Sequence, residues 1–113
     1  MTIEFKNQEP VEIEASLFLT EILIRNLFSN AVNHNLANGS VHILIKKNKI
    51  IFSNTGSTIP LKEDKLYQRF SKASTSTHGN GLGLAIVKNI VENQNWIITY
   101  SYENKMHQFI VTF

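Results

Sequence analysis

Apolar and polar residues alternate along several short segments of this 113-residue chain. Alternation with a period of two is typical of a strand that buries one face, and turns rich in Asn, Gly or Pro separate the segments. Two of these turns, at Lys47-Asn48 and at Glu103-Asn104-Lys105, are short enough to close hairpins. The strands predicted by this pattern span residues 3–5, 11–13, 41–46, 49–53, 96–102 and 107–113.

The segment that follows Ser16 has the 3.6-residue periodicity of a long amphipathic helix. Ser16 is a favourable N-cap, and Asn38-Gly39 is expected to end the helix at about Leu36. The many Leu and Ile residues of this segment predict a mostly buried helix, with Glu21 and Arg25 on its exposed side.

A second amphipathic helix is predicted to begin near Leu82 and to end at Asn93 or Asn95, since asparagine tolerates a left-handed helix stop. Residues 61–67 could form a third, short helix, and the Ser- and Thr-rich residues 71–80 are expected to form a loop. The apolar stripe of the second helix contains Leu84, Val87 and Val91, with Ile86 and Ile90 beside them.

The order of these elements is strands, helix, hairpin, helix and hairpin. Antiparallel strands connected by turns, together with two amphipathic helices, predict a two-layer α/β sandwich (α+β class). We find no internal repeat and no domain boundary, so residues 1–113 are expected to form a single domain.

The composition is that of an ordinary globular domain, with 42% hydrophobic and 18% charged residues. A formal charge of +2 is too small to indicate nucleic-acid binding, and Lys46, Lys47 and Lys49 are interpreted as a solvated turn in preference to a phosphate-binding patch. The absence of cysteine excludes disulfides and thiolate metal sites. No apolar run approaches the roughly 20 residues that span a bilayer.

Three asparagines, Asn26, Asn30 and Asn33, recur at positions i, i+4 and i+7 of the first predicted helix and therefore share one face. Asparagine is a mediocre helix former, so helix propensity does not explain the row. The amides could satisfy nearby backbone groups, or they could line a ligand cavity and offer an oxygen to Mg²⁺. The row alone does not decide between these interpretations.

Two glycine-containing segments add candidate chemistry. Residues 79–84 (Gly-Asn-Gly-Leu-Gly-Leu) precede a helix, where glycine permits close approach and free N–H groups face anions. This segment does not follow a strand and lacks the P-loop ending, which argues against a Rossmann site and against a P-loop. A phosphate-binding lid hinge is favoured over a simple flexible loop. Residues 54–60 (Asn-Thr-Gly-Ser-Thr-Ile-Pro) follow a strand and form either a simple turn or a site where Asn54 accepts from an adenine amino group.

In this order, the segments resemble the GHKL superfamily and specifically the catalytic domain of sensor histidine kinases. The resemblance covers nearly the whole chain, and it implies a Bergerat-type sandwich with a mixed, mostly antiparallel five-stranded sheet on about three helices. The segments that carry it are residues 26–34 (Asn-Leu-Phe-Ser-Asn-Ala-Val-Asn-His) as N box, 54–60 as first glycine box, 66–70 (Leu-Tyr-Gln-Arg-Phe) as F box, and 79–87 as second glycine box.

This resemblance implies roles for individual residues. Asn30 would hold Mg²⁺ and Asn26 would assist near the phosphates, as the two catalytic residues, while Asn54 would face adenine. Lys72 would contact a phosphate, and residues 71–80 would be a shortened ATP lid. The nucleotide-binding residues implied in this way are Asn26, Asn30, Asn33, His34, Asn54, Gly56, Ile59, Lys72, Gly79, Gly81, Leu82, Gly83 and Leu84.

Two positions depart from the family's pattern, and a third separates this chain from other members of the superfamily. The family usually has Asp at the position of Asn54 and Gly at the position of Thr58, and both changes imply weaker nucleotide binding. The ATP-hydrolysing members of the superfamily carry a Glu base where this chain has Asn26. A neutral amide cannot take a proton from water, so we expect slow hydrolysis of ATP.

The function implied is that of a histidine protein kinase, a transferase of two-component signalling and phosphorelay. None of the four histidines, His34, His42, His78 and His107, lies in a segment resembling a phosphoacceptor box, so the acceptor histidine is expected on a separate dimerisation domain. Through that domain a response regulator would be an indirect partner. We expect a cytoplasmic and, in isolation, monomeric domain that binds ATP and Mg²⁺ but no nucleic acid; whether its parent is membrane-anchored stays open.

Two alternatives remain at this point. Asn54 and Thr58 motivate a degenerate domain that binds nucleotide weakly or not at all and acts as a regulatory interaction module. A serine-kinase anti-sigma relative shares the implied fold, and acid-stable phosphate on its target would distinguish it from a histidine kinase.

Overall fold

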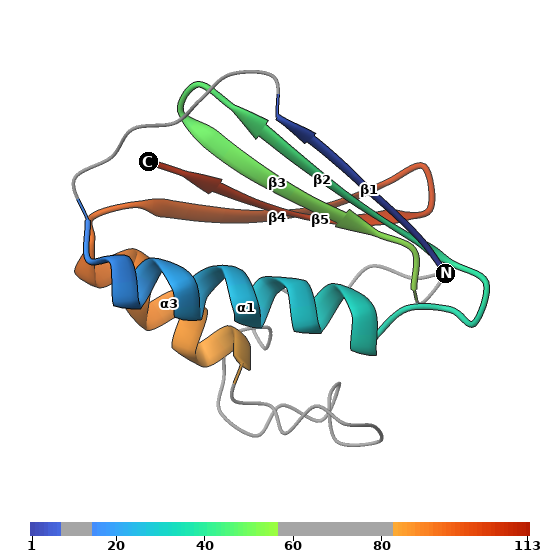
Figure 1. The fold of residues 1–113 in the computed structure, drawn as a ribbon, viewed down its shortest axis with the longest axis horizontal. Coiled ribbons are helices and arrows are strands. Elements are labelled where there is room, and N and C mark those ends of the chain that lie inside the picture. Colours follow the sequence, from blue (N-terminus) through green and yellow to red (C-terminus); the bar gives the residue numbers. More distant parts are fainter. Residues whose placement is uncertain (8–14, 57–82) are drawn as a thin grey trace.

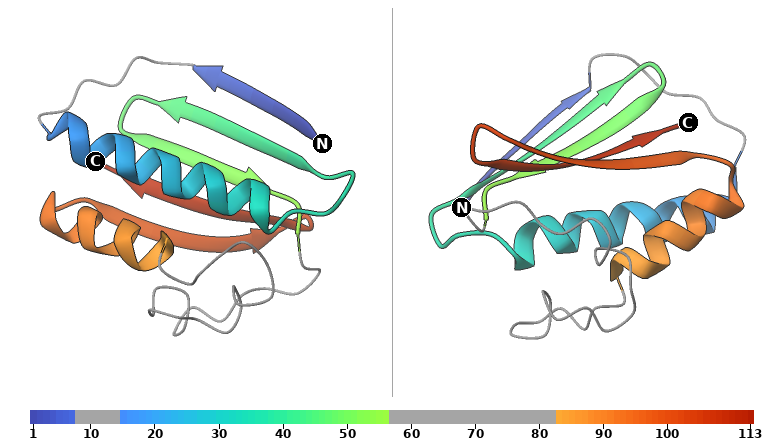
Figure 2. Two further views of the ribbon diagram at one scale, coloured as in Figure 1. Left: turned by 60° about the horizontal axis from the view of Figure 1, so that its bottom comes forward. Right: turned by 180° about the vertical axis from the view of Figure 1, so that it is seen from behind.

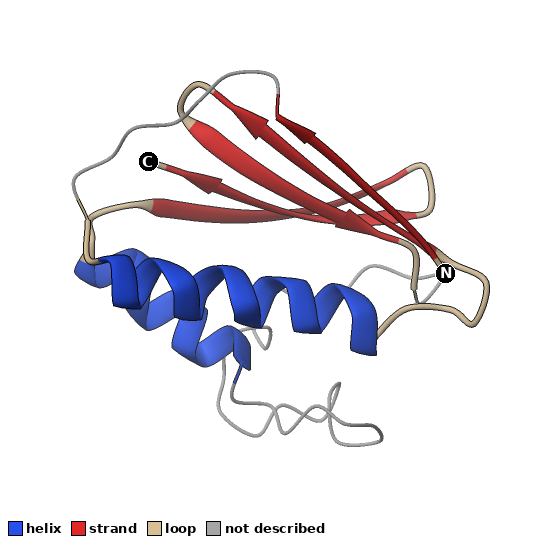
Figure 3. Cartoon of the chain, viewed as in Figure 1, coloured by secondary structure: helices blue, strands red, loops and turns tan. Residues whose placement is uncertain are grey.

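The computed structural model describes residues 1–7, 15–56 and 83–113 of the chain. Its elements form two layers, a five-stranded sheet and a layer in which helices α1 and α3 cover one face of that sheet (Figures 1, 2 and 3). They are β1 (Thr2–Asn7), α1 (Leu17–Asn33), β2 (Ser40–Lys46), β3 (Lys49–Asn54), α3 (Gly83–Asn93), β4 (Ile97–Glu103) and β5 (Met106–Thr112). The predicted two-layer sandwich is thereby confirmed.

The order of strands in the sheet is β1-β2-β3-β5-β4. β1 pairs with β2 in parallel, and the other three pairings are antiparallel, so the expected mixed, mostly antiparallel sheet is confirmed. A parallel pair needs a crossover connection, and α1 provides it between β1 and β2. The expected third helix is not confirmed, because residues 61–67 and the predicted strand 11–13 lie outside the described residues.

The turns lie where the sequence predicts them. Lys47-Asn48 joins β2 to β3, and Asn104 and Lys105 join β4 to β5 with positive φ angles of 51° and 62°. Two consecutive left-handed residues are the geometry that matches the twist of a two-residue hairpin. Of the two candidate stops for α3, Asn95 is the left-handed residue, with φ of 60°.

Helix α1 begins as predicted and ends earlier than predicted. The Ser16 side chain accepts a hydrogen bond from the Leu19 N–H at 3.2 Å, which confirms the N-cap. The helix stops at Asn33, and not near Leu36, because the Asn35 side chain replaces the helical hydrogen bonds. Its Nδ2 donates to the carbonyl of Ala31 at 3.2 Å, and its Oδ1 accepts from the Leu36 N–H at 2.8 Å.

The prediction that α1 is mostly buried is wrong. Leu17 and Phe18 in its first turn are 74% and 70% exposed, and Ile24 is 40% exposed. Because α1 covers one face of the sheet and nothing among the described residues covers its other side, only one stripe of its surface meets the core. The buried residues of α1 are Leu23, Leu27 and Ala31.

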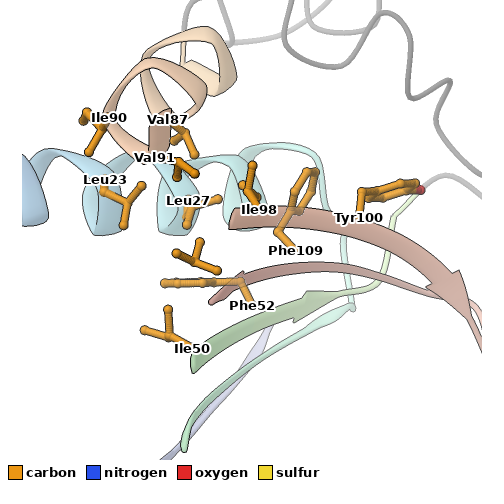
Figure 4. Packing of buried hydrophobic residues seen from close by; sticks show 11 residues of the cluster. Leu23, Leu27, Ile50, Phe52, Val87, Ile90, Val91, Ile98, Tyr100 and Phe109 are labelled. Carbon is orange, nitrogen blue, oxygen red and sulfur yellow. The ribbon is translucent and has the colours of Figure 1, made fainter. Parts of the chain in front are cut away.

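The core lies between the two helices and the inner face of the sheet (Figure 4). Leu23 and Leu27 of α1 pack with Val87 and Val91 of α3 over Phe52 of the central strand. Burial of each such side chain contributes about 1.5–3 kcal/mol. The core therefore fixes α1 and α3 side by side above the sheet. Ile86, predicted beside the apolar stripe of α3, is instead 39% exposed.

Candidate functional site

The carboxyl-terminal half of α1 runs between the start of α3 and the end of β3. At the α3 end, a Cβ atom built on Gly83 would lie 3.2 Å from Oδ1 of Asn26. At the β3 end, a Cβ atom built on Gly56 would lie 2.8 Å from the carbonyl oxygen of His34. The structure therefore brings two pairs of the expected site residues together, Asn26 with Gly83 and His34 with Gly56.

Asn54 is the last residue of β3, and its side chain is buried at 3% exposure. Its Nδ2 donates to the carbonyl oxygen of Thr55 at 2.8 Å, whereas its Oδ1 has no hydrogen-bond partner among the described residues. A buried acceptor without a donor costs about 1–3 kcal/mol and calls for an explanation. An adenine amino group is a donor of the kind that Oδ1 lacks, so this residue fits an adenine nucleotide.

Gly56 lies two residues beyond Asn54 and is itself buried. Besides the His34 carbonyl, its added Cβ would meet Cδ2 of His107 at 3.3 Å and Nδ2 of Asn54 at 3.5 Å. A contact of 2.8 Å with a backbone oxygen cannot be relieved by turning a side chain. Glycine is therefore required here so that the backbone after β3 can approach the end of α1.

A hydrogen-bonded junction formed by Asn35, Gly39, Ser40 and Thr55 supports this backbone. The Thr55 hydroxyl accepts from the Ser40 N–H at 2.9 Å and donates to Oδ1 of Asn35. Nδ2 of Asn35 in turn donates to the Ser40 carbonyl at 2.9 Å. The sequence does not predict this junction, because Asn35 and Thr55 are twenty positions apart and neither belongs to a periodic pattern.

A second group of residues that the sequence does not single out is a polar cluster on β4 and β5. His107 is buried at 3% exposure, and its Nδ1 shares a 2.7 Å hydrogen bond with the hydroxyl of Tyr100. The ring of Tyr102 packs on His107 with centroids 4.6 Å apart. A signal for this cluster does exist, since His107 is in phase with the buried residues Phe109 and Val111 of the same strand.

Asn26, Asn30 and Asn33 are half-buried along α1. Nδ2 of Asn26 donates to the carbonyl oxygen of Ile22 at 2.8 Å. This hydrogen bond is the kind expected if the amides of this row satisfy nearby backbone groups. The Oδ1 atom of the same side chain faces Gly83. One half of this amide is therefore structural, and the other half faces the start of α3.

His34 is the C-cap of α1 and is half-buried. Burial disfavours the charged imidazolium and lowers the pKa of His34 below its ordinary value of 6.5.

The lowered pKa of His34 predicts a pH dependence of stability. A group whose pKa is depressed on folding stabilises the protein fully above its unfolded pKa, and that contribution is lost as the pH falls through the folded pKa. We therefore expect the free energy of unfolding to fall more steeply in the wild type than in His34→Gln as the pH drops below 6.5. Urea titrations of both proteins between pH 8 and pH 5 would measure the difference, and parallel curves would contradict the prediction.

Several expected site residues are not placed. Ile59, Lys72, Gly79, Gly81 and Leu82 lie outside the described residues, as do Thr58 and the expected lid at 71–80. Leu84 is described, and it packs against the hydrophobic core.

The described residues also bear on metal binding and on membrane insertion. No group of three or more His, Cys, Asp or Glu residues within 1–7, 15–56 and 83–113 could hold a metal ion. Over the same part of the chain, no helix combines the length and the apolar character needed to cross a membrane.

Comparisons with known proteins identify the family of the chain. The family model of the histidine kinase-, DNA gyrase B-, and HSP90-like ATPases matches residues 16–113. Among individual relatives, the heme sensor protein HssS of Staphylococcus aureus is 38% identical over 95 residues, which cover 80% of this chain and 20% of HssS. The chain thus spans about a fifth of the length of this relative.

Solved structures of kinases share the fold. The solved catalytic domain of histidine kinase ThkA is 26% identical, with a TM-score of 0.79 over 97% of this chain and 76% of that domain's chain. The mycobacterial sensor histidine kinase MprB, 23% identical, superposes with a TM-score of 0.76 over 96% of this chain and 79% of MprB. The chain therefore belongs to the family of histidine kinase-, DNA gyrase B- and HSP90-like ATPases, as an ATP-binding catalytic domain of the sensor histidine kinase type.

Proposed function

We propose that this domain holds Mg-ATP so that the γ-phosphoryl group is transferred to a histidine on another domain of its parent protein. The observation that carries the proposal is the buried Oδ1 of Asn54, which lacks a donor among the described residues and lies beside the close approach of Gly56 to α1. A buried acceptor and an adjacent glycine backbone suit a flat base with an exocyclic amino group.

The base would be recognised at Asn54, and the phosphates would lie toward the start of α3. This helix begins at Gly83, which has no side chain to fill the space beside Oδ1 of Asn26. The first N–H groups of a helix have no partners within the helix and attract anionic oxygen. We therefore assign the phosphate side of the site to Asn26, Asn30 and the first turn of α3.

Mg²⁺ bound to the phosphates would supply electrostatic stabilisation of the charge that moves during phosphoryl transfer. Asn30 lies one helical turn beyond Asn26 on the same face of α1 and is half-buried, so its amide oxygen is suited to a hard cation. Because one amide is a weak site by itself, most of the remaining ligands would be phosphate oxygens and water.

Asn26 also bears on what happens to ATP in the absence of an acceptor. Its Nδ2 donates to the Ile22 carbonyl, and a neutral amide has no basic atom that could accept a proton from water. Hydrolysis would therefore be slow, and ATP would remain available for transfer.

The acceptor and the other partners follow from the kind of protein to which the domain belongs. HssS is named as a heme sensor and is about five times longer than the part matched here, so the parent of this domain would contain further domains. We propose that the acceptor histidine lies on a dimerisation domain, that a response regulator takes the phosphoryl group from it, and that the domain acts in the cytoplasm as a monomeric unit. The comparisons lend no support to the alternative of a degenerate domain.

Transfer of labelled phosphate tests the proposal directly. We expect the domain, mixed with the phosphoacceptor domain of its own parent protein and γ-labelled ATP, to place acid-labile phosphate on the acceptor only when Mg²⁺ is present. Asn30→Ala should lower the transfer rate about tenfold or more, because it removes the proposed protein ligand to the cation.

The matched control is Asn93→Ala, which changes an exposed asparagine at the end of α3 and should leave transfer unchanged. Equal transfer with and without Mg²⁺, or equal rates for the wild type and Asn30→Ala, would refute the assigned role of Asn30. Acid-stable phosphate would indicate a serine kinase instead.

A further inference from the structure

The buried polar cluster on β4 and β5 lies directly beside the base end of the site. In the register of β3 and β5, His107 is the cross-strand partner of Asn54, and both side chains are on the inner face of the sheet. The added Cβ on Gly56 would lie 3.3 Å from Cδ2 of His107 and 3.5 Å from Nδ2 of Asn54. The His107 ring and the Asn54 amide thus both border the space beside the Cα atom of Gly56.

The His107 ring is held on two sides. Its Nδ1 shares the 2.7 Å hydrogen bond with Tyr100, and Tyr102 packs against its face. Figure 4 shows Tyr100 at the edge of the hydrophobic cluster, with its hydroxyl oxygen pointing away from the other labelled side chains. The ring of Tyr100 is therefore anchored in the core while its hydroxyl fixes the orientation of His107.

The orientation of the Asn54 amide decides which base can bind. Adenine presents an amino donor at its six position, whereas guanine presents a carbonyl acceptor there. With Nδ2 bound to the Thr55 carbonyl, Oδ1 is the atom left for a ligand. It can accept from the six-amino group of adenine, whereas the six-carbonyl of a guanine in the same position would face it as a second acceptor. A rotated amide would offer Nδ2, which suits the six-carbonyl of guanine and not the six-amino group of adenine.

We infer that the Tyr100–His107 pair is a positioning and specificity-determining element, which holds the Asn54 amide in the orientation that selects a purine with an amino group at the six position. The inference rests on the proposed binding of an adenine nucleotide, and neither residue touches the reacting phosphate. The Asn54 amide is bonded to the Thr55 carbonyl, and across the strand pair its neighbour on the same face of the sheet is His107, whose ring borders the same space beside Gly56.

The first test needs no nucleotide. Tyr100→Phe keeps the ring in the core and removes the hydroxyl that holds His107, so we expect the side-chain amide signals of Asn54 in the NMR spectrum to shift and broaden. Ile98→Val is the matched control, because it weakens the core on the same strand without touching the polar cluster. Unchanged Asn54 signals in Tyr100→Phe would overturn the inference, whatever the domain binds.

The second test compares ADP with GDP by calorimetry. We expect the preference of the wild type for ADP to fall about tenfold in Tyr100→Phe and in His107→Phe, because a mobile amide can present either atom to the base. Ile98→Val should lose stability and keep the preference. A preference that is unchanged in both aromatic variants contradicts the inference alone, whereas a wild type that binds neither nucleotide contradicts the proposed function as well.

Discussion

Asn54→Val is expected to weaken ADP binding by about 10–100-fold while changing the free energy of unfolding by less than about 1 kcal/mol. Oδ1 of Asn54 is a buried acceptor without a partner among the described residues, so its loss removes a cost from the free protein. The hydrogen bond from Nδ2 to the Thr55 carbonyl is lost at the same time, and the two effects largely offset each other. Valine also suits the last position of a strand.

In the complex with ADP, no second effect offsets the loss of Oδ1. Without Oδ1, the adenine amino group would be buried against an apolar side chain with its hydrogen bond unmade, which costs about 1–3 kcal/mol. Calorimetric titration with ADP and urea unfolding of the same samples would measure both quantities. This separation of binding from stability distinguishes a ligand-binding residue from a structural one.

Ser53→Ala is the matched control for Asn54→Val. Ser53 precedes Asn54 in β3, is similarly buried at 8% exposure, and faces the opposite side of the sheet. We expect its replacement to leave ADP binding unchanged. A loss of affinity in Ser53→Ala equal to that in Asn54→Val would show that the binding site responds to any change in β3, and the specific role of Asn54 would be refuted.

Local sequence signals were sufficient to predict most of the architecture. Both hairpins were predicted from alternation and turn residues, and Asn104 and Lys105 lie in the turn predicted for the second. Asn95 is one of the two residues expected to stop α3 in a left-handed conformation. The N-cap at Ser16 was also predicted correctly. These features depend on contacts between residues close in the sequence, which composition and spacing report directly.

Features set by contacts between distant residues were not predicted. The end of α1 is determined by the side chain of Asn35, whose partners include Ser40 and Thr55, and helix propensity contains no information about them. The exposure of Leu17 and Phe18 depends on which side of α1 meets the sheet, and the sequence of an apolar helix does not specify this.

The candidate site likewise combines features that the local sequence predicts with features that depend on distant contacts. The residue types of Asn54 and Gly56 suggested a turn or a base-binding site, but only the packed structure shows that one Asn54 oxygen lacks a donor and that Gly56 meets the end of α1. For His107 the sequence indicated only that it lies outside any phosphoacceptor-like segment, although its phase in the strand placed it on the buried face. Its hydrogen bond to Tyr100 depends on the register that the two-residue turn imposes on β4 and β5.

Gly39→Ala is expected to destabilise the domain by about 2–4 kcal/mol, the largest effect of any single methyl group that we predict. The added Cβ would overlap Oδ1 of Asn35 and the hydroxyl oxygen of Thr55. Gly39 cannot move away easily, because its carbonyl accepts from the Thr2 N–H and its own N–H donates to the Leu36 carbonyl, both at 3.0 Å. The Asn35 and Thr55 side chains must therefore shift, and the hydrogen bonds between the end of α1, β2 and β3 break.

This loss should extend to the nucleotide, since Thr55 lies between Asn54 and Gly56 and its carbonyl orients the Asn54 amide. We expect ADP affinity in Gly39→Ala to fall together with stability, in contrast to Asn54→Val, where affinity falls alone. Urea unfolding and calorimetry on both variants would show the two patterns.

The physical reason for the loss of stability in Gly39→Ala can be tested in a variant that lacks the Asn35 and Thr55 side chains. In the double variant Asn35→Ala/Thr55→Ala, both atoms that the new methyl group would overlap are absent, so adding Gly39→Ala should cost less than about 1 kcal/mol. The exposed neighbour Asn38→Ala should change stability by less than about 0.5 kcal/mol. An equal loss from Gly39→Ala in both backgrounds would mean that the glycine is required by the backbone itself, and the junction would then not be what couples α1 to the nucleotide site.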